Sequence, residues 1–240
     1  MKDGRTKSNK YRGYSGKKML IACSMIEDEI NDVFSRFGCE DIEIRWQDRG
    51  YHNDPDDLRR VIQREIDRAE ADGAEIVMLA YGLCGKGAAG WQTGRAVLAM
   101  PRFDDCVNMM LCTGKRSRRN YLKAGHMYLT GGWSRDEGAL LTMLDSYLAK
   151  YGERKGKKLM KLMLDSYTDV SVIDTGCYEL KPVLDYADEC AKQLGLAKSL
   201  VPGGNEMLEK LITGEWDEDI LVKLPGEKVL DEDFEFEPFN

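Results

Sequence analysis

Short apolar runs alternate with amphipathic segments along most of the chain. Runs typical of buried strands occupy residues 18–24, 74–81, 95–100 and 170–174. The segment 54–72 instead carries apolar side chains at helical spacing, behind Asp54 as a predicted N-cap. Strands that alternate with helices in this way form βαβ units. We therefore expect an α/β fold: a single Rossmann-like domain with a doubly wound, mainly parallel sheet and helices on both faces.

The other segments extend this alternation. Further strands are predicted at residues 42–48, 127–130 and 198–201, the last of them in the same sheet. Further helices are predicted at residues 27–37, 104–123, 137–150, 157–166, 181–194 and 205–213. Charge then suggests the domain limits, which are a flexible basic N-terminal arm at 1–17, the α/β domain at 18–226 and an acidic C-terminal tail at 227–240.

Composition narrows the class of protein. The 240 residues are 42% hydrophobic, which is enough for a substantial core, and the net charge of −7 argues against a nucleic-acid partner. No apolar run is long enough to span a bilayer and no secretory signal begins the chain, so we expect a cytoplasmic protein without a membrane partner. The seven cysteines contain no C-x-x-C pair, which favours buried thiols, metal ligands or reactive thiols over a disulfide framework.

Open α/β sheets bind ligands at the carboxyl ends of their strands, and chemically active residues follow the predicted strands here. The sequence YGLCGKG follows residues 74–81, and PRFDDC follows residues 95–100. A helix after YGLCGKG would lower the pKa of the Cys84 thiol. We expect Arg102 and Asp105 to be catalytic, although an aspartate at this junction is also a common N-cap. The residues expected to contact a cofactor or small-molecule ligand are Gly82, Gly85, Gly87, Thr130, Trp133 and Asp174.

The same edge suggests a metal site. With only two histidines a three-histidine zinc centre is excluded, but Cys23, Cys84 and Cys106, with His52, form a ligand set for zinc, iron or an iron–sulfur cluster. Two alternatives stay open: a metal-independent enzyme with Cys84 as nucleophile and His52 or Asp105 as base, or a partner-binding protein whose cysteines belong to the core. The P-loop, the dinucleotide fingerprint and G-x-S-x-G are all missing from the sequence. The cysteines and the histidine expected to be structural are Cys39, Cys112, Cys190 and His126.

Seven segments together resemble one known family. They are IACSMIEDEI, YHNDP, YGLCGKG, MPRFDDC, GHMYLTGGW, VIDTG and GEWD, and they cover about Met19 to Pro225. The family is the bacterial and archaeal one catalogued as domain of unknown function 1638. The resemblance implies a metal, corrinoid or methyl-carrier role in anaerobic one-carbon metabolism, as an enzyme or an accessory factor, with a corrinoid protein or methyltransferase as partner. By position, the family's motif cysteines and histidine match Cys23, Cys84, Cys106 and His52.

The chain departs from the family pattern at three places. Asp104 stands where many members have histidine, Cys112-Thr113 replaces Gly-Ser, and His126-Met127 replaces Thr-Tyr. If Asp104 replaces a ligand, the ligand atom changes from nitrogen to oxygen. That change would alter which metal the site prefers.

Overall fold

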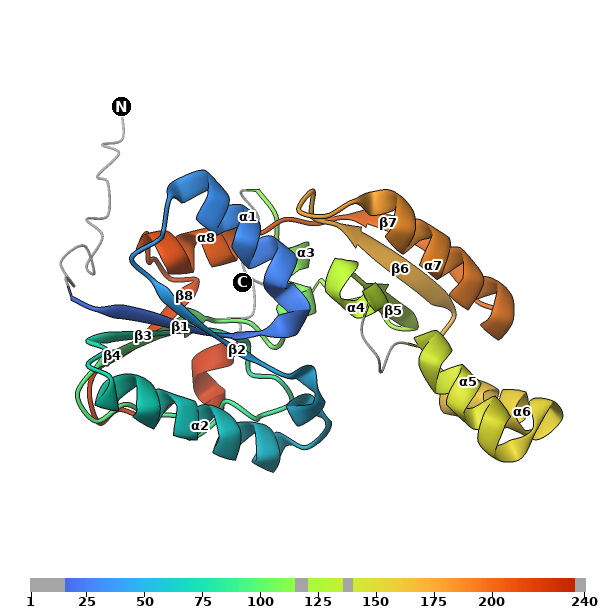
Figure 1. The fold of residues 1–240 in the computed structure, drawn as a ribbon, viewed down its shortest axis with the longest axis horizontal. Helices are drawn as coiled ribbons and strands as arrows, with labels where there is room; N and C mark the ends of the chain where they lie inside the picture. Colours follow the sequence, from blue (N-terminus) through green and yellow to red (C-terminus); the bar gives the residue numbers. More distant parts are fainter. Residues whose placement is uncertain (1–15, 115–120, 136–139, 236–240) are drawn as a thin grey trace.

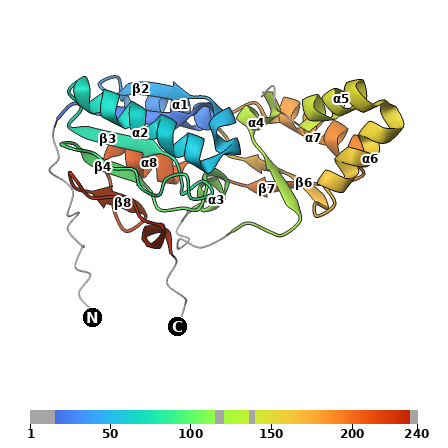
Figure 2. The same cartoon turned by 90° about the horizontal axis from the view of Figure 1, so that it is seen from below.

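The computed structural model describes residues 16–114, 121–135 and 140–235. The strands of these residues form two sheets, which lie toward opposite ends of the molecule's long axis (Figures 1 and 2). The larger sheet has the order β2-β1-β3-β4-β8, with β1 (Lys18–Cys23), β2 (Glu43–Gln47), β3 (Ile76–Ala80), β4 (Val97–Pro101) and β8 (Ile220–Lys223). The smaller has the order β5-β6-β7, with β5 (His126–Leu129), β6 (Asp169–Asp174) and β7 (Ala197–Pro202).

The larger sheet confirms the predicted doubly wound α/β fold. Its strands β1, β2, β3 and β4 pair in parallel, and only β8 runs antiparallel, at the edge beside β4. Helices α1 (Glu27–Phe37) and α8 (Glu206–Thr213) cover one face, and α2 (Pro55–Ala71) covers the other (Figure 1). Strands β3 and β4 are buried along their whole length, as their continuous apolar sequences predict.

Local sequence signals begin and end these helices. The Asp54 side chain caps α2 by accepting hydrogen bonds from the backbone N–H groups of Asp56 and Asp57, and Pro55 occupies the first turn. Helix α1 ends at Gly38, which adopts the left-handed φ of 63° that glycine tolerates best. The predicted N-cap and the helical spacing therefore identified both helices.

The smaller sheet differs from the single sheet that was predicted. Strand β7 pairs with β6, so residues 198–201 do not extend the larger sheet. Helices α5 (Leu140–Tyr151), α6 (Glu153–Met163) and α7 (Leu180–Leu194) share a separate apolar core with Val170 and Val172 of β6. The predicted helix 104–123 is also wrong, because α3 (Cys106–Leu111) is short. Thr113 and Gly114 follow it, and Gly114 has a φ of 66° that does not continue a helix.

The two sheets meet at the carboxyl ends of their strands. Helix α4 (Gly131–Arg135) follows β5 and packs on the short helix η1 (Ser24–Ile26) that follows β1. A side chain on Gly132 would collide with the backbone carbonyl of Met25, so glycine permits this close approach. Residues that follow strands in both sheets therefore come together at one junction.

The chain ends fall partly outside the described residues. Of the predicted arm 1–17, only Gly16 and Lys17 are described. Within the predicted tail, Val229 and Phe234 are buried against the larger sheet, and residues 231–234 form the short helix η3 (Asp231–Phe234). Over the described ranges, no helix combines the length and apolar character needed to cross a membrane.

Candidate functional site

The two cysteine-bearing loops of the larger sheet are held side by side by backbone hydrogen bonds. The N–H of Leu83 donates to the carbonyl of Phe103 at 2.8 Å, and the N–H of Cys84 donates to the carbonyl of Asp104 at 2.7 Å. Because Cys106 begins α3 just beyond Asp104, these bonds place Cys84 and Cys106 beside each other. Gly82 makes the approach possible, since a Cβ there would lie 2.5 Å from the Phe103 carbonyl oxygen.

Cys84 lies in a strained turn. Its φ is 48°, in the left-handed region that costs a residue with a Cβ roughly 1–2 kcal/mol. Lys86 has a φ of 73° and Gly85 one of 63°, so three consecutive residues turn in this unusual way. Strain of this kind persists where the surrounding structure enforces it, and it is concentrated at functional sites.

The prediction that a following helix lowers the pKa of Cys84 is wrong. Residues 84–90 form turns, and no helix begins there. The pKa of the Cys84 thiol is raised to about 12, chiefly by burial and in addition by the charges of Asp105 and Cys23, while a hydrogen bond with the Gly82 backbone lowers it. At neutral pH the Cys84 side chain is therefore a protonated thiol.

The structure brings Cys23, Cys84 and Cys106 together. Burial raises the pKa of the Cys106 thiol well above its ordinary value, and the charges of Cys84, Asp105 and Cys23 add to the effect. Tyr81 directly follows β3. Burial and the charges of Cys23, Cys84 and Cys106 raise the pKa of its hydroxyl well above the ordinary value. None of the seven cysteines, all of which are described, forms a disulfide. We call Cys23, Cys84 and Cys106 the thiol cluster.

The Tyr81 ring lies between His52 and the thiol cluster. The His52 ring stacks on that of Tyr81 at a centroid distance of 5.8 Å. Its Nδ1 lies 3.1 Å from the Arg49 carbonyl oxygen, which can only accept, so Nδ1 carries the proton. Burial lowers the pKa of His52, which leaves the ring neutral and Nε2 with a lone pair at neutral pH.

Two residues expected to contact a cofactor come from the smaller sheet. Thr130 follows β5, and Trp133 lies in α4. Trp133 packs against the same buried core of the larger sheet as Leu83 and Cys84, and the Arg49 guanidinium lies 5.1 Å from the centre of its ring. The Thr130 hydroxyl, the Trp133 indole N–H and the Tyr81 hydroxyl are all buried, and within the described part of the chain none has a hydrogen-bond partner. Unsatisfied buried polar atoms are rare in proteins, and one ordinary cause is a ligand that supplies the partner.

A cleft of about 710 Å³ opens beside this junction. Its walls are mainly apolar and come from β5, α5, α6 and the segment before β5. Asp105 and Trp133 line it at the end near the thiol cluster, and His126 lines it at the other end of β5. A cleft of this volume with apolar walls and a few polar groups has the character of a small-molecule site.

Asp105 connects the cleft to the thiols. Its side chain accepts a hydrogen bond from the backbone N–H of Asn108 at 2.7 Å, so it is an N-cap of α3, which was the alternative given for it. Burial raises its pKa, and its own charge raises the pKa values of Cys84 and Cys106. A ligand in the cleft would meet this carboxyl group before the thiols.

Other predicted site residues have partners elsewhere. Arg102 holds the C-terminal segment, because its guanidinium donates to the carbonyls of Asp233 at 2.8 Å and Glu218 at 3.2 Å. Asp174 accepts from the backbone N–H of Gly176 in the turn after β6. Gly87 is required for packing, since a Cβ there would lie 2.6 Å from the Leu58 side chain.

The residues expected to be structural are largely so. Cys39, Cys112 and Cys190 are buried in apolar surroundings. His126 is part of a polar group on β5 and β6, where its Nδ1 lies 2.7 Å from the Ser171 hydroxyl, which in turn donates to Asp169 at 2.7 Å. Because Ser171 gives its proton to Asp169, this arrangement does not place a base on the serine as a hydrolase triad does.

Sequence reasoning missed Glu29, which is fully buried in α1. The pKa of Glu29 is raised to about 7, chiefly by burial and in addition by the charge of Asp28. A hydrogen bond from Thr175 and the charge of Arg135 lower the pKa and so oppose this rise. Its position gave a signal, since Glu29 falls on the apolar stripe of Ile26, Ile30 and Val33, where an exposed glutamate is not expected.

The donor set suits a thiophilic metal, but the geometry is incomplete. Sulfur ligands favour zinc, copper(I) and iron–sulfur clusters over hard cations. Within residues 16–114, 121–135 and 140–235, however, no three side chains of His, Cys, Asp or Glu are placed to hold one metal ion. A closed zinc site needs four such ligands, so these residues fit only a group that brings ligands of its own.

The comparisons with known proteins identify a family but no characterised relative. A family model described as a protein of unknown function (DUF1638) matches residues 46–212. No curated protein and no solved structure matches the chain.

Proposed function

The chain belongs to the DUF1638 family, and we propose that it binds a metal-containing cofactor or a metal-bound substrate through Cys84 and Cys106. The observation that carries this proposal is the thiol cluster, in which Cys23 at the end of β1, Cys84 in the turn after β3 and Cys106 at the start of α3 lie near one another without a disulfide. Keeping these thiols together in a buried place has no evident benefit for packing, while a soft metal would convert them to thiolates.

Two thiolates, rather than a complete cage, fit the described geometry. Cys84 and Cys106 are each partly accessible, and backbone hydrogen bonds join the turn of Cys84 to the residues just before Cys106, whereas Cys23 is buried. The missing ligands would come from the bound group itself. His52, with its unprotonated Nε2, and Cys23 are the further protein ligands that we propose could join such a group.

The cleft accounts for the organic part of such a ligand. Its apolar walls would hold an uncharged portion, and Asp105 and Arg49 would contact polar groups at the end near the thiols. The indole N–H of Trp133, which lines the cleft, would then gain a hydrogen-bond partner. The family resemblance suggests anaerobic one-carbon metabolism, with a corrinoid or methyl carrier, as the setting for an enzyme or accessory factor of this kind.

A metal-independent role for Cys84 as nucleophile has less support. A nucleophilic cysteine needs a thiolate at neutral pH, which a pKa of about 12 does not provide. Asp105 faces Cys84, but it accepts the capping hydrogen bond of α3. Coordination to a metal would remove the thiol proton without a base, and this favours the metal reading.

Anaerobic titration with Co²⁺ tests the proposal, because thiolate ligation gives Co²⁺ an intense charge-transfer absorption. We expect this absorption in the wild-type protein, with an affinity that rises with pH as the thiol protons are displaced. Cys84→Ser and Cys106→Ser should each weaken binding at least tenfold, on the order of the effect of disturbing a metal site. Cys39→Ser is the matched control, since Cys39 is buried before β2 and away from the cluster.

Two results would contradict the proposal. One is Co²⁺ binding without thiolate absorption, and the other is equal affinity in all three serine variants and the wild type. Circular dichroism spectra of each variant would show that the fold is retained.

A further inference from the structure

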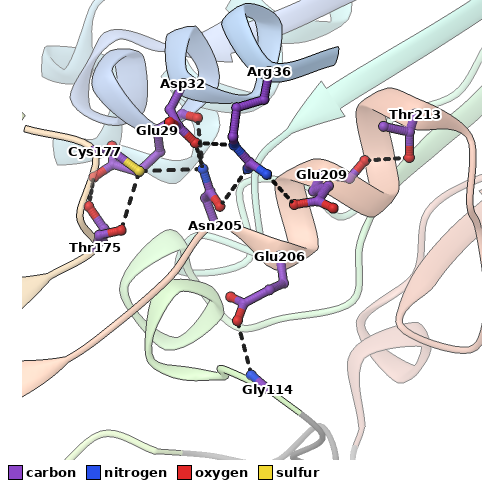
Figure 3. A network of polar contacts seen from close by, with 10 residues as sticks. All are labelled: Glu29, Asp32, Arg36, Gly114, Thr175, Cys177, Asn205, Glu206, Glu209 and Thr213. Carbon is purple, nitrogen blue, oxygen red and sulfur yellow. Dashed lines mark hydrogen bonds and ion pairs between the residues drawn. The ribbon is translucent and has the colours of Figure 1, made fainter.

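A fourth cysteine lies beside Glu29 at the junction of the two sheets. Figure 3 shows Glu29 of α1, Thr175 and Cys177 of the turn after β6, and Asn205 before α8 in one network of polar contacts. Thr175 links Glu29 to Cys177. Its hydroxyl donates to Glu29 Oε1 at 2.9 Å, and its backbone carbonyl accepts from the Cys177 thiol at 3.4 Å. Cys177 is partly accessible, whereas Glu29 is fully buried.

One of the two carboxylate oxygens of Glu29 makes no hydrogen bond to the described residues. This oxygen is Oε2, and it is buried. The Glu29 charge raises the pKa values of three neighbours, Cys177, Tyr178 and Cys106, so the carboxyl group lies among them. A buried carboxyl group with a pKa of about 7 can accept a proton at neutral pH and give it back.

Cys177 has the surroundings of a thiol that needs such a base. Its pKa is raised to about 12, chiefly by burial. The charges of Glu29 and Asp32 contribute to the rise, while the hydrogen bond with Thr175 and the charge of Arg36 lower the pKa. The Asn205 side-chain N–H donates to the Cys177 sulfur at 3.3 Å, which would stabilise negative charge on that atom. The thiol is therefore protonated at rest. Asn205 donates to its sulfur, and two carboxyl groups lie close enough to affect its pKa: Asp32, which also shares a hydrogen bond with Cys177, and Glu29, which is linked to it through Thr175.

We propose that Glu29 and Cys177 form a base–thiol pair that reacts with small electrophiles. In the reaction, the proton of the Cys177 thiol passes to the Glu29 carboxylate, directly or through one water molecule. The sulfur uses its electron pair to form a bond to an electrophilic carbon, and the leaving group departs with the electrons of the broken bond. Asn205 keeps its hydrogen bond to the sulfur as charge develops there.

This pair differs from the thiol cluster. Cys84 and Cys106 are proposed to lose their protons to a metal, whereas Cys177 would lose its proton to a carboxylate. The proposal therefore stands or falls without reference to metal binding, and a protein that binds no Co²⁺ could still contain the pair.

The rate of alkylation of Cys177 by iodoacetamide, followed site by site with mass spectrometry from pH 5 to 9, tests the pair. We expect the wild-type rate to rise through about pH 7, where Glu29 loses its proton. Glu29→Gln should abolish this inflection and slow alkylation at pH 8 at least tenfold, since general bases contribute roughly 10²–10⁴-fold. Glu27→Gln removes an exposed carboxylate from the same turn of α1 and should behave as the wild type.

The sign of the effect decides between two roles for Glu29. If its charge only repels the thiolate, Glu29→Gln would lower the pKa of Cys177 and speed alkylation. A faster or unchanged rate would therefore overturn the proposal, and so would a wild-type Cys177 that is not alkylated in the folded protein.

Thr175→Val provides a second test if Glu29→Gln does not fold. Because the Thr175 hydroxyl lowers the pKa of Glu29, its removal should move the inflection of the Cys177 rate to higher pH. An inflection that stays in place would show that Glu29 does not control the reaction.

Discussion

Glu29→Gln should stabilise the protein above neutral pH. In the folded state the pKa of Glu29 is raised from 4.5 to about 7, chiefly because burial disfavours the carboxylate. A group with a raised acid pKa contributes most stability while it is protonated. That contribution is complete below pH 4.5 and is lost as the pH rises to about 7, because the folded protein must then bury a charge.

The size of the effect follows from the shift. A difference of about 2.5 pKa units, between 4.5 and about 7, corresponds to roughly 3 kcal/mol at about 1.4 kcal/mol per unit. Glutamine keeps the oxygen that accepts from the Thr175 hydroxyl but carries no charge. The variant should therefore match the wild type near pH 4.5 and exceed its unfolding free energy by about 3 kcal/mol at pH 8.

Urea denaturation at several pH values between 4.5 and 8 measures the difference. Other groups titrate in this range, including His52, whose lowered pKa acts in the opposite direction, but they are common to both proteins and cancel in the comparison. Glu27→Gln, from the exposed side of the same turn, is the control. Parallel stability curves for the wild type and Glu29→Gln would refute the reasoning, since they would mean that Glu29 ionises as easily in the folded protein as in the unfolded chain.

Two further predictions concern the loop that carries Cys84. Gly82→Ala should lower the unfolding free energy by roughly 1–3 kcal/mol or more, because its Cβ would meet backbone atoms of Phe103 and Asp105 that cannot move aside. It should also weaken Co²⁺ binding, and unchanged denaturant midpoints and affinity would contradict the packing argument. Cys84→Gly should be about 1 kcal/mol more stable than Cys84→Ala in the same denaturation assay, because glycine adopts a φ of 48° without strain. Equal stability of these two variants would show that the turn is not strained.

The fold could be predicted where local pattern determines it. Apolar runs such as Ile76–Ala80, and the capping signal at Asp54, identified strands and helices because each depends on near neighbours in the sequence. Which strands pair is a long-range property. Strand β7 has the same pattern in either sheet, and only the separate core around Val170 and Val172 explains why it pairs with β6.

Only part of the candidate site could be predicted, because some of its properties depend on contacts between residues that are far apart in the sequence. The proximity of Cys23, Cys84 and Cys106 could be predicted from the sequence, because parallel strands present their carboxyl ends at one edge of the sheet. The pKa of Cys84 was predicted in the wrong direction, because turns rather than a helix follow it and burial of the thiol dominates its pKa. Arg102 follows a strand as the rule requires, yet it binds the C-terminal segment, which the sequence places far away.

Several residues at the junction of the two sheets lower the stability of the fold, and this is a reason to assign them a function. The left-handed turn at Cys84, the buried carboxyl group of Glu29 and the Tyr81 hydroxyl, which has no hydrogen-bond partner among the described residues, each lower the stability of the fold. Tyr81 and Cys84 follow β3 and Glu29 lies in α1, and all three lie where the carboxyl ends of the two sheets meet. A stable core would have replaced them with apolar side chains. Since a ligand could relieve the cost at Tyr81 and use the thiols and the carboxyl group, its binding should raise the stability of the whole domain by an amount that grows with the logarithm of the ligand concentration once that concentration exceeds the dissociation constant.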